Sequence, residues 1–325
     1  MKLARRQFLH LAAGVAALPV ATRIARAQAY PSRPVRWIIG FAPGGAADMA
    51  IRLVADGLSE RLGQPVLVDN RPGAGTNIAT EAVVRAPADG YTIGIVTPAN
   101  ATNATLYDKL PFNFLRDVVP VAGINSSPII ILVHPSMPIR SVGELIAYAK
   151  ANPGKLNMAT GTNGTANHMT QGLFKMMAGV DIVDVPYRGE ALALPDLVAG
   201  QVHGMFITLT SGLEFARDGR LRAVAVTTAT RASALPDVPS VAEVVAGFES
   251  STWNGVGAPR NTPPDIVARL NRDINAVLAD PKIKRRFEDV GATTLVVSPA
   301  EFGKHVEAET EKWGKVVKFL NVKPN

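Results

Sequence analysis

The 325-residue sequence contains no cysteine. This absence excludes disulfide bonds, a thiolate nucleophile, zinc sites with cysteine ligands and a lipid anchor on an amino-terminal cysteine. Aromatic residues are also scarce, at 6% of the chain, whereas glycine and proline are frequent, with 28 and 24 residues. The five histidines lack the spacing of metal ligands, so we expect no metal ion, and no motif indicates a cofactor. The composition is typical of an α/β protein with many tight turns.

The amino terminus has the three-part layout of a secretory signal. Basic residues precede the apolar run 8–21, and a small-residue cleavage site, Ala25-Arg26-Ala27, follows it. The apolar run is shorter than the about 20 residues that span a bilayer. The segment Arg5-Arg6-Gln7-Phe8-Leu9 resembles a twin-arginine export signal, and the alternative is an ordinary Sec signal with two adjacent arginines. Residues 1–27 are therefore predicted to be a signal peptide.

A strong positive charge is missing once this segment is set apart. Cleavage after Ala27 removes five basic residues and no acidic one, so the net charge falls from +7 to +2. A strongly basic chain would indicate nucleic acid or anionic lipid as a partner, and that inference no longer applies. We expect a soluble, periplasmic protein that is not lipid-anchored, is a monomer and binds no nucleic acid.

Short β-rich runs alternate with helical patterns along the chain. In the first hundred residues, strands expected at 35–39, 66–68 and 91–96 enclose helices near 51–58 and 77–86. The alternation continues between residues 129 and 227, which predicts a parallel sheet with covering helices. No long linker separates the halves, so we expect the chain to cross between two α/β lobes more than once. A ligand would then lie in the cleft at the carboxyl ends of the strands.

Turns rich in Gly, Thr and Asn follow several expected strands. They are 43–48, 73–77, 161–168 and 187–189, and Thr97 ends a further strand. The first turn of a helix has unpaired backbone N–H groups at the positive end of the helix dipole, and glycine lets a ligand approach them closely. Turns from two lobes would thus clamp a dicarboxylate. The same residue types also form ordinary N-caps and βα turns, and no dinucleotide or P-loop motif is present.

Six segments resemble, in order, the Bug family, the solute receptors of tripartite tricarboxylate transporters. They are FAPGGAAD (41–48), VDNRPGAGTNI (68–78), ADGYT (88–92), GTNGTANH (161–168), VPYRG (185–189) and WNGVGAP (253–259). The resemblance implies a periplasmic-binding-protein fold of the type II, two-crossover kind, with lobe 1 at 28–126 plus 249–325 and lobe 2 at 127–248. It also implies a small organic carboxylate as ligand, either a di- or tricarboxylate or an aromatic acid. The membrane subunits of such a transporter are the implied partners.

The resemblance further implies which residues bind the ligand. They are Pro43, Gly44, Gly45, Asp48, Asn77 and Thr97 in lobe 1, and Gly161, Thr162, Gly164, Thr165, His168, Tyr187, Arg188 and Gly189 in lobe 2. Helix capping is the alternative role for Asp48, and capping or packing for His168. One segment departs from the family, in which an aspartate often comes shortly after a Met-Phe pair, whereas residues 207–211 of this chain are Ile, Thr, Leu, Thr and Ser. We therefore expect a less cationic or more apolar ligand than an amino acid.

Two other functions remain open. A periplasmic receptor that reports its ligand to a membrane sensor kinase would use the same fold and pocket. An exported hydrolase would need a nucleophile, a base and an orienting group, and the sequence contains no GxSxG elbow. We expect no catalytic residues and predict that the protein is not an enzyme.

Overall fold

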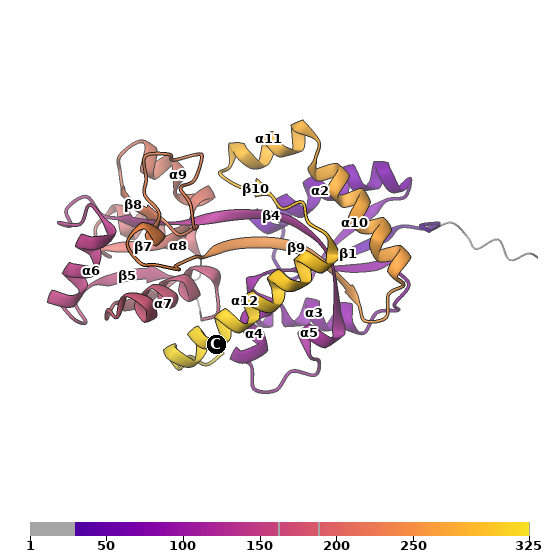
Figure 1. Ribbon diagram of the computed structural model, residues 1–325, viewed down its shortest axis with the longest axis horizontal. Coiled ribbons are helices and arrows are strands. Elements are labelled where there is room, and N and C mark those ends of the chain that lie inside the picture. Colours follow the sequence, from indigo (N-terminus) through magenta and orange to yellow (C-terminus); the bar gives the residue numbers. More distant parts are fainter. Residues whose placement is uncertain (1–29, 162, 188, 325) are drawn as a thin grey trace, which may run out of the picture.

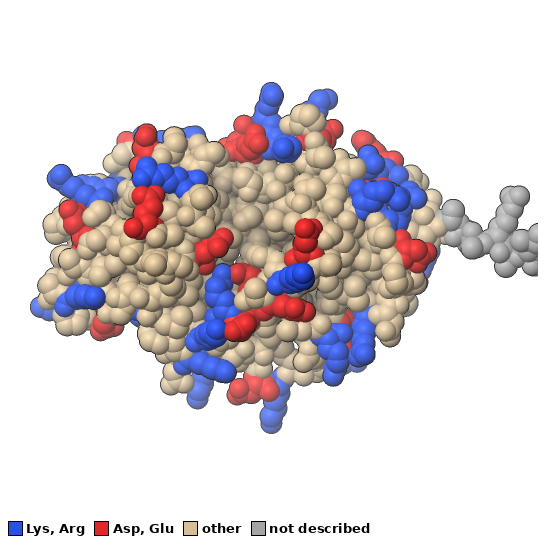
Figure 2. Space-filling view, in the orientation of Figure 1, with Lys and Arg blue, Asp and Glu red and all other residues tan. Residues whose placement is uncertain are grey.

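The computed structural model describes residues 30–161, 163–187 and 189–324. The predicted signal peptide and two predicted ligand residues, Thr162 and Arg188, lie outside the described residues. Two α/β lobes lie side by side and are joined by long central strands, while the last helix runs along both lobes (Figure 1). On the face shown in Figure 2, acidic and basic side chains are mixed, and the surface between the lobes is hollowed and mainly uncharged.

The first lobe begins with a regular βα alternation. Its first elements are β1 (Val35–Ile39), α2 (Ala46–Leu62), β2 (Val66–Asn70), the 3-10 turn η1 (Ala74–Thr76), α3 (Asn77–Val84), β3 (Thr92–Val96), α4 (Pro98–Leu106) and α5 (Phe114–Asp117). The carboxyl-terminal segment adds α10 (Pro264–Leu278), α11 (Pro281–Asp289), β10 (Thr293–Thr294) and α12 (Pro299–Leu320). Strand β1 pairs in parallel with β2 and with β3, so the three strands end at the same edge of the sheet.

The second lobe repeats this alternation. Its elements are α6 (Val142–Ala151), β5 (Asn157–Thr160), α7 (Ala166–Ala178), β6 (Val183–Pro186), α8 (Glu190–Val198), β7 (Gly204–Thr208), α9 (Leu209–Arg217), β8 (Arg222–Val226) and the 3-10 turn η2 (Val241–Glu243). Strand β5 pairs in parallel with β6 and β7. Most strands and helices predicted from the hydrophobic periodicity are present, with ends that differ by one or two residues.

Two strands cross between the lobes. Strand β4 (Val118–Val133) pairs with β9 (Ser251–Pro259) along its first part, and its last residues pair with β7 and β8. The first sheet has the order β2-β1-β3-β9-β4, and the second has β6-β5-β7-β4-β8. Each lobe thus has its first strand between the second and the third, and β5 is the equivalent of β1. The β1–α2 and β5–α7 turns therefore occupy equivalent places.

Each lobe has its own hydrophobic core. In lobe 1, helix α2 buries Ile51, Val54 and Leu58, one helical turn apart, against Trp37 and other apolar residues. Each such side chain contributes about 1.5–3 kcal/mol when fully buried. A further cluster joins Phe174 of α7 with Leu106 of α4 and Trp313 of α12. Helices α4 and α12 therefore also pack against the second lobe. The lobe boundaries proposed from the sequence stay a prediction.

Candidate ligand-binding site

The β1–α2 turn presents exposed backbone at the carboxyl end of β1. Pro43, Gly44 and Gly45 are exposed, and Gly45 begins α2 without a side-chain cap. Gly44 has a φ of 83°, a left-handed conformation that glycine adopts without steric cost. The carboxylate of Asp48 accepts the Gly44 N–H at 2.8 Å. The Gly44 amide is therefore engaged within the turn and holds it in place.

Asp48 is the centre of a buried hydrogen-bond network. Its side chain is 3% exposed, and it accepts Arg52 Nε–H at 3.0 Å and Asn70 Nδ2–H at 2.9 Å. The bond from Arg52 is the largest of the causes that lower the pKa of Asp48 to about 2, so the carboxylate is charged at neutral pH. A carboxylate with three donors, paired to an arginine, has little capacity left for a ligand. This geometry favours the capping role for Asp48.

A stripe of polar side chains on α4 follows the carboxyl end of β3. Thr97 is buried, and its N–H and hydroxyl both donate to Asn100 Oδ1, at 2.8 and 3.1 Å. Asn103, one turn later, donates to the carbonyl of Gly75 at 2.6 Å and to Asn77 Oδ1 at 3.0 Å. Helix α4 therefore links the turn after β3 to the turn after β2.

The turn after β2 has an unusual backbone. Four successive residues have positive φ, namely Gly73 (128°), Ala74 (46°), Gly75 (59°) and Thr76 (79°). A left-handed conformation at a residue other than glycine costs about 1–3 kcal/mol, and such strain concentrates at functional sites. Within the described residues, the buried Nδ2 of Asn77 has no hydrogen-bond partner. This turn thus combines backbone strain with an unused buried donor.

The β5–α7 turn of lobe 2 is built in the same way as the β1–α2 turn. Gly164 also has a φ of 83°, and Thr165 begins the helix. His168 Nδ1 accepts the Gly164 N–H at 3.4 Å, and the His168 ring is 3% exposed. Burial is the main cause that lowers the pKa of His168. Gly161 is buried. Glycine is required there, because a Cβ at this position would collide with Thr165 Oγ1.

The carboxyl terminus of the chain contacts this turn. Asn163, in the middle of the turn, donates its Nδ2–H to the carbonyl of Lys323 at 3.0 Å. A few residues earlier, Leu320 of α12 packs on Gly172 of α7, where a Cβ would collide with it. The end of α12 is thus fastened to the helix that the turn introduces.

The β6–α8 turn offers a ligand fewer free polar groups. The Tyr187 hydroxyl donates to Asp196 Oδ2 at 2.7 Å, so it faces α8. Gly189 is exposed and begins α8 without a side-chain cap. The next residue, Glu190, accepts Asn167 Nδ2–H at 2.7 Å and the Thr208 N–H at 2.8 Å. Glu190 therefore ties together the amino ends of α7, α8 and α9.

Helix α4 of the first lobe contacts the β5–α7 turn of the second lobe at Gly164. A Cβ at Gly164 would lie 2.7 Å from Leu106 Cδ2 and 3.8 Å from Thr102 Cγ2, both on α4 of the first lobe. The hydroxyls of Thr102 and of Thr160, the last residue of β5, are buried and lack a partner within the described part of the chain. Thr102 adjoins the turn through its methyl group, and Thr160 precedes the turn along the chain.

The β1–α2 turn connects to the same region through the end of β1. Gly40 packs so closely on the β2–α3 turn that a Cβ there would lie 2.6 Å from Thr76 Cβ. Contacts therefore lead from Gly40 to Thr76, from Asn77 to Asn103, and from α4 to the β5–α7 turn. The last of these links is an apolar contact, in which Leu106 Cδ2 and Thr102 Cγ2 of α4 lie beside Gly164.

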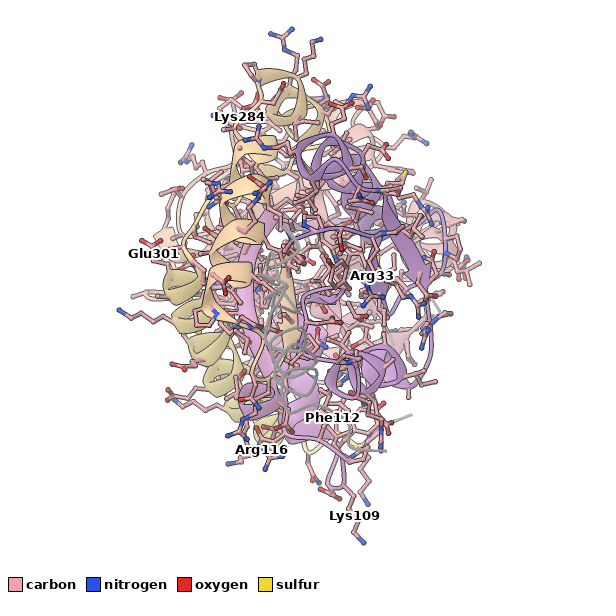
Figure 3. All side chains as sticks on the ribbon, turned by 90° about the vertical axis from the view of Figure 1, so that its right-hand side faces the viewer. Arg33, Lys109, Phe112, Arg116, Lys284 and Glu301 are labelled. Atoms are coloured by element: carbon pink, nitrogen blue, oxygen red, sulfur yellow. The ribbon has the colours of Figure 1, made fainter. Side chains whose placement is uncertain are left out.

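An apolar pocket lies elsewhere on lobe 1. Val96, Phe114, Val118 and Phe302 line it, and Glu307 is its only ionisable group. A carboxylate beside an apolar wall disfavours an anionic ligand, so this pocket does not suit the predicted chemistry. Figure 3 looks at the outer end of this lobe, where Lys109 extends into the solvent and Glu301 marks the start of α12.

Across the described ranges, no cluster of three or more His, Asp or Glu residues is arranged to hold a metal ion. In that same part of the chain, no helix combines the length and apolarity needed to cross a membrane.

The comparison with protein families covers most of the chain. Residues 50–322 match the model of the tripartite tricarboxylate transporter family receptor. The chain belongs to this receptor family. The Bug resemblance is confirmed, because the receptor is 35% identical to Protein BugT of Bordetella pertussis over 314 residues, which cover 96% of this chain and 94% of BugT.

Solved structures agree with this membership. The structure of R. palustris Rpa4515 with adipate is 39% identical to the receptor, with a TM-score of 0.79, and covers 91% of this chain and 100% of that one. MatC (Rpa3494) from Rhodopseudomonas palustris with bound malate is 30% identical, with a TM-score of 0.75, and covers 89% of this chain and 100% of that one. The predicted two-lobe periplasmic-binding-protein fold is therefore confirmed.

The site residues themselves stay a prediction. Thr97 and Asn77 each bond to an asparagine of α4. Gly164 and His168 bond to each other, and the Tyr187 hydroxyl faces Asp196. The sequence analysis missed the polar residues that support the turns. They are Arg52, Asn70, Asn100, Thr102, Asn103, Thr160, Asn167 and Glu190. Asn100 and Asn103 follow the predicted Thr97 at intervals of one helical turn, and this spacing was a signal that could have found these two.

Proposed function

We propose that the receptor binds a small organic carboxylate, a di- or tricarboxylate or an aromatic acid, between its lobes. The observation that carries this proposal is the pair of equivalent turns after β1 and β5, each starting a long helix with a left-handed glycine. The adipate and malate in the two related structures support a carboxylate ligand. Binding is the whole activity in this proposal, without a catalytic step.

The free energy of ligand binding requires more than the interaction with the two helix amino termini. Each helix amino terminus contributes about 0.3–1 kcal/mol to anion binding, and about 2 kcal/mol in a partly buried geometry. Micromolar affinity needs about 8 kcal/mol. The remainder has to come from direct hydrogen bonds and from expelled water. The buried amide of Asn77 and the hydroxyls of Thr102 and Thr160 are donors without partners in the described structure, and they suit this task.

The ligand is expected to lack an ammonium group. Related receptors often carry an aspartate shortly after the Met-Phe pair, and this chain has none at 207–211. Ile207, the first of these residues, is fully buried in the core of lobe 2. The next residue, Thr208, donates its hydroxyl to Glu190 Oε2 at 2.9 Å. Glu190 is already engaged by three donors, so it is poorly available to a ligand cation.

The receptor is proposed to act in the periplasm and to deliver its ligand to the membrane subunits of a tripartite tricarboxylate transporter. Family membership supports this role, and the signal-like residues 1–27 support export.

A ligand panel on residues 28–325 tests the proposal. Thermal unfolding is measured with aliphatic dicarboxylates, a tricarboxylate, aromatic acids, the matching diamides and amino acids. A ligand at 100 times its dissociation constant adds about 2.7 kcal/mol of stability, which shifts the midpoint by several degrees. We expect shifts with carboxylates and none with diamides. Stabilisation by amino acids but not by plain carboxylates would contradict the proposal.

Two matched glycine variants locate the site. Gly44 and Gly63 both have positive φ, and a Cβ at either position would meet no atom within 4 Å. Gly44→Ala and Gly63→Ala therefore carry a similar backbone cost of about 1–2 kcal/mol. We expect only Gly44→Ala to weaken carboxylate binding in calorimetry. Equal affinities for the two variants would remove the β1–α2 turn from the site.

A further inference from the structure

The turns after β1 and β5 match residue by residue. In both, a glycine with a φ of 83° precedes the first residue of a helix cap, and the fourth residue after the glycine accepts its N–H. That residue is Asp48 in lobe 1, at 2.8 Å, and His168 in lobe 2, where Nδ1 is the acceptor at 3.4 Å. One turn geometry is thus closed by a carboxylate in one lobe and by an imidazole in the other.

The surroundings explain why the acceptors differ. In lobe 1, Arg52 lies one helical turn after Asp48 and pairs with it at 3.0 Å, so the charge is offset. The equivalent position in lobe 2 is Gly172, where a Cβ would lie 3.0 Å from Val316 Cγ1 and would collide with Leu320. The carboxyl-terminal helix therefore leaves no room for an arginine there. A carboxylate at position 168 would lack the partner that Asp48 has.

The hydrogen bond defines the state of the His168 ring. A nitrogen that accepts an N–H carries a lone pair, so the ring proton lies on Nε2 and the ring is neutral. Two charged groups act on the ring, Asp184 on β6 and Lys175 on the same helix. They are paired with each other at 3.0 Å, so they offset one another. Burial of the ring lowers the pKa of His168, which agrees with a neutral imidazole.

We infer that His168 is the positioning residue that sets the charge preference of the lobe-2 turn. Its neutral Nδ1 shapes the turn as Asp48 does in lobe 1, but it adds no negative charge at the amino end of α7. An ionised carboxylate of the ligand is therefore accepted at this turn. Thr102 packs its methyl group beside Gly164, and Thr160 ends the strand that leads into the turn. Both residues also carry a buried hydroxyl without a partner in the described part of the chain, so hydrogen-bonding capacity next to this turn is unused. The inference rests on the proposed function.

Two substitutions at position 168 separate charge from shape. Asparagine and aspartate have the same size, and Asp48 shows that a side chain of this length reaches the glycine N–H. At pH 7.5 we expect His168→Asn to retain carboxylate affinity within about threefold, and His168→Asp to lose at least tenfold. The ratio of the two variants' dissociation constants should shrink as the pH is lowered to 5. The introduced aspartate is buried without a charge partner, which raises its pKa, so it gains a proton over this range. Equal affinities for the two variants at every pH would overturn the inference.

A second histidine provides the matched control. His203 Nδ1 accepts the Asn157 N–H at 2.9 Å, at the opposite, amino end of β5. His203→Asp therefore makes the same chemical change in the same lobe away from the turn, and we expect carboxylate affinity within twofold of the wild type. A tenfold loss in this variant would assign the effect of His168→Asp to a general disturbance of lobe 2 and overturn the inference.

A ligand-free measurement keeps the inference distinct from the proposed function. Long-range proton–nitrogen NMR on the wild-type receptor at pH 7 should show the His168 ring protonated only at Nε2. An Nδ1–H tautomer or an imidazolium ion would overturn the inference even if carboxylates bind. If the tautomer is as expected but no carboxylate binds the wild type, the proposed function fails, and the charge preference fails with it.

Discussion

Replacing Asp48 by asparagine should reduce stability in a manner that depends on pH. The asparagine keeps an oxygen for the Gly44 N–H but loses the charge that pairs with Arg52. The pKa of Asp48 is lowered from 3.8 to about 2. At 1.36 kcal/mol per pKa unit, this shift corresponds to about 2.4 kcal/mol. Arg52 is half-exposed and partly screened by water, so we expect a loss of about 2 kcal/mol at pH 7.

The sign of the pH dependence follows from the lowered pKa. The folded carboxylate holds its proton less tightly than the unfolded one, so its contribution is complete above about pH 5. It is lost as the pH falls through 3.8 towards 2, because over this range the unfolded state binds a proton that the folded carboxylate does not. The free energy of unfolding of Asp48→Asn should therefore be lower than that of the wild type by about 2 kcal/mol at pH 7 and by about 1 kcal/mol at pH 3.

Urea unfolding followed by circular dichroism, at pH 7, 5, 4 and 3, measures this difference. A second carboxylate in lobe 1 serves as the control. Asp117 accepts the Asn113 N–H at 2.8 Å and pairs with Arg116, and its pKa is also lowered to about 2. Asp117→Asn should show a similar pH dependence without a change in carboxylate affinity, whereas Asp48→Asn should weaken both. If the free energies of unfolding of wild type and Asp48→Asn differ by the same amount at pH 7 and at pH 3, the reasoning is refuted.

Two further substitutions test the packing of α12. Gly172→Ala places a methyl group against Leu320 and Val316, and should cost about 1–3 kcal/mol in urea unfolding. Gly143→Ala has open space around it and should be neutral or stabilising, so equal losses in the two variants would contradict the packing. Glu309→Gln weakens the shared acceptor of the Trp253 and Trp313 indole N–H groups, at 3.0 and 2.8 Å. It should cost about 1–3 kcal/mol and change tryptophan emission, whereas the exposed Glu311→Gln should do neither.

The sequence predicted the elements whose signals are local. Helix α2 follows from the spacing of Ile51, Val54 and Leu58, and all three are buried. Ser298 and Glu301, three residues apart at the start of α12, form a capping box, with bonds of 2.8 and 3.2 Å between each side chain and the other residue's backbone N–H. In these places the residues that decide the structure lie within one or two turns of each other.

The first part of the crossing strand β4 and the helix α4 were not predicted. The first part of β4, VVPVAGINSSP, contains two prolines and several turn-forming residues, yet it forms a strand because β9 pairs with it. Helix α4, PANATNATL, has little apolar periodicity, and its helix is supported by Asn100 and Asn103 hydrogen bonds to α3 and η1. Both elements depend on partners far away in the sequence.

Within the candidate site, the sequence located the turns but not the residues that close them. A glycine followed four residues later by Asp48 or His168 was visible, but the meaning of that spacing depends on a positive φ at the glycine. The contrast between Arg52 and Gly172 depends on Leu320, which approaches from a helix about 150 residues later.

The contact between Asn163 and Lys323 has a practical consequence for laboratory work. A purification tag, fluorophore or surface linker attached to the carboxyl terminus would start two residues beyond the carbonyl that restrains this turn. A dye placed there should report ligand addition, and a bulky fusion there should distort affinity measurements. Attachment ahead of Tyr30 avoids both effects, because the Tyr30 hydroxyl donates to the carbonyl of Gly90 and both residues lie in lobe 1, away from this turn.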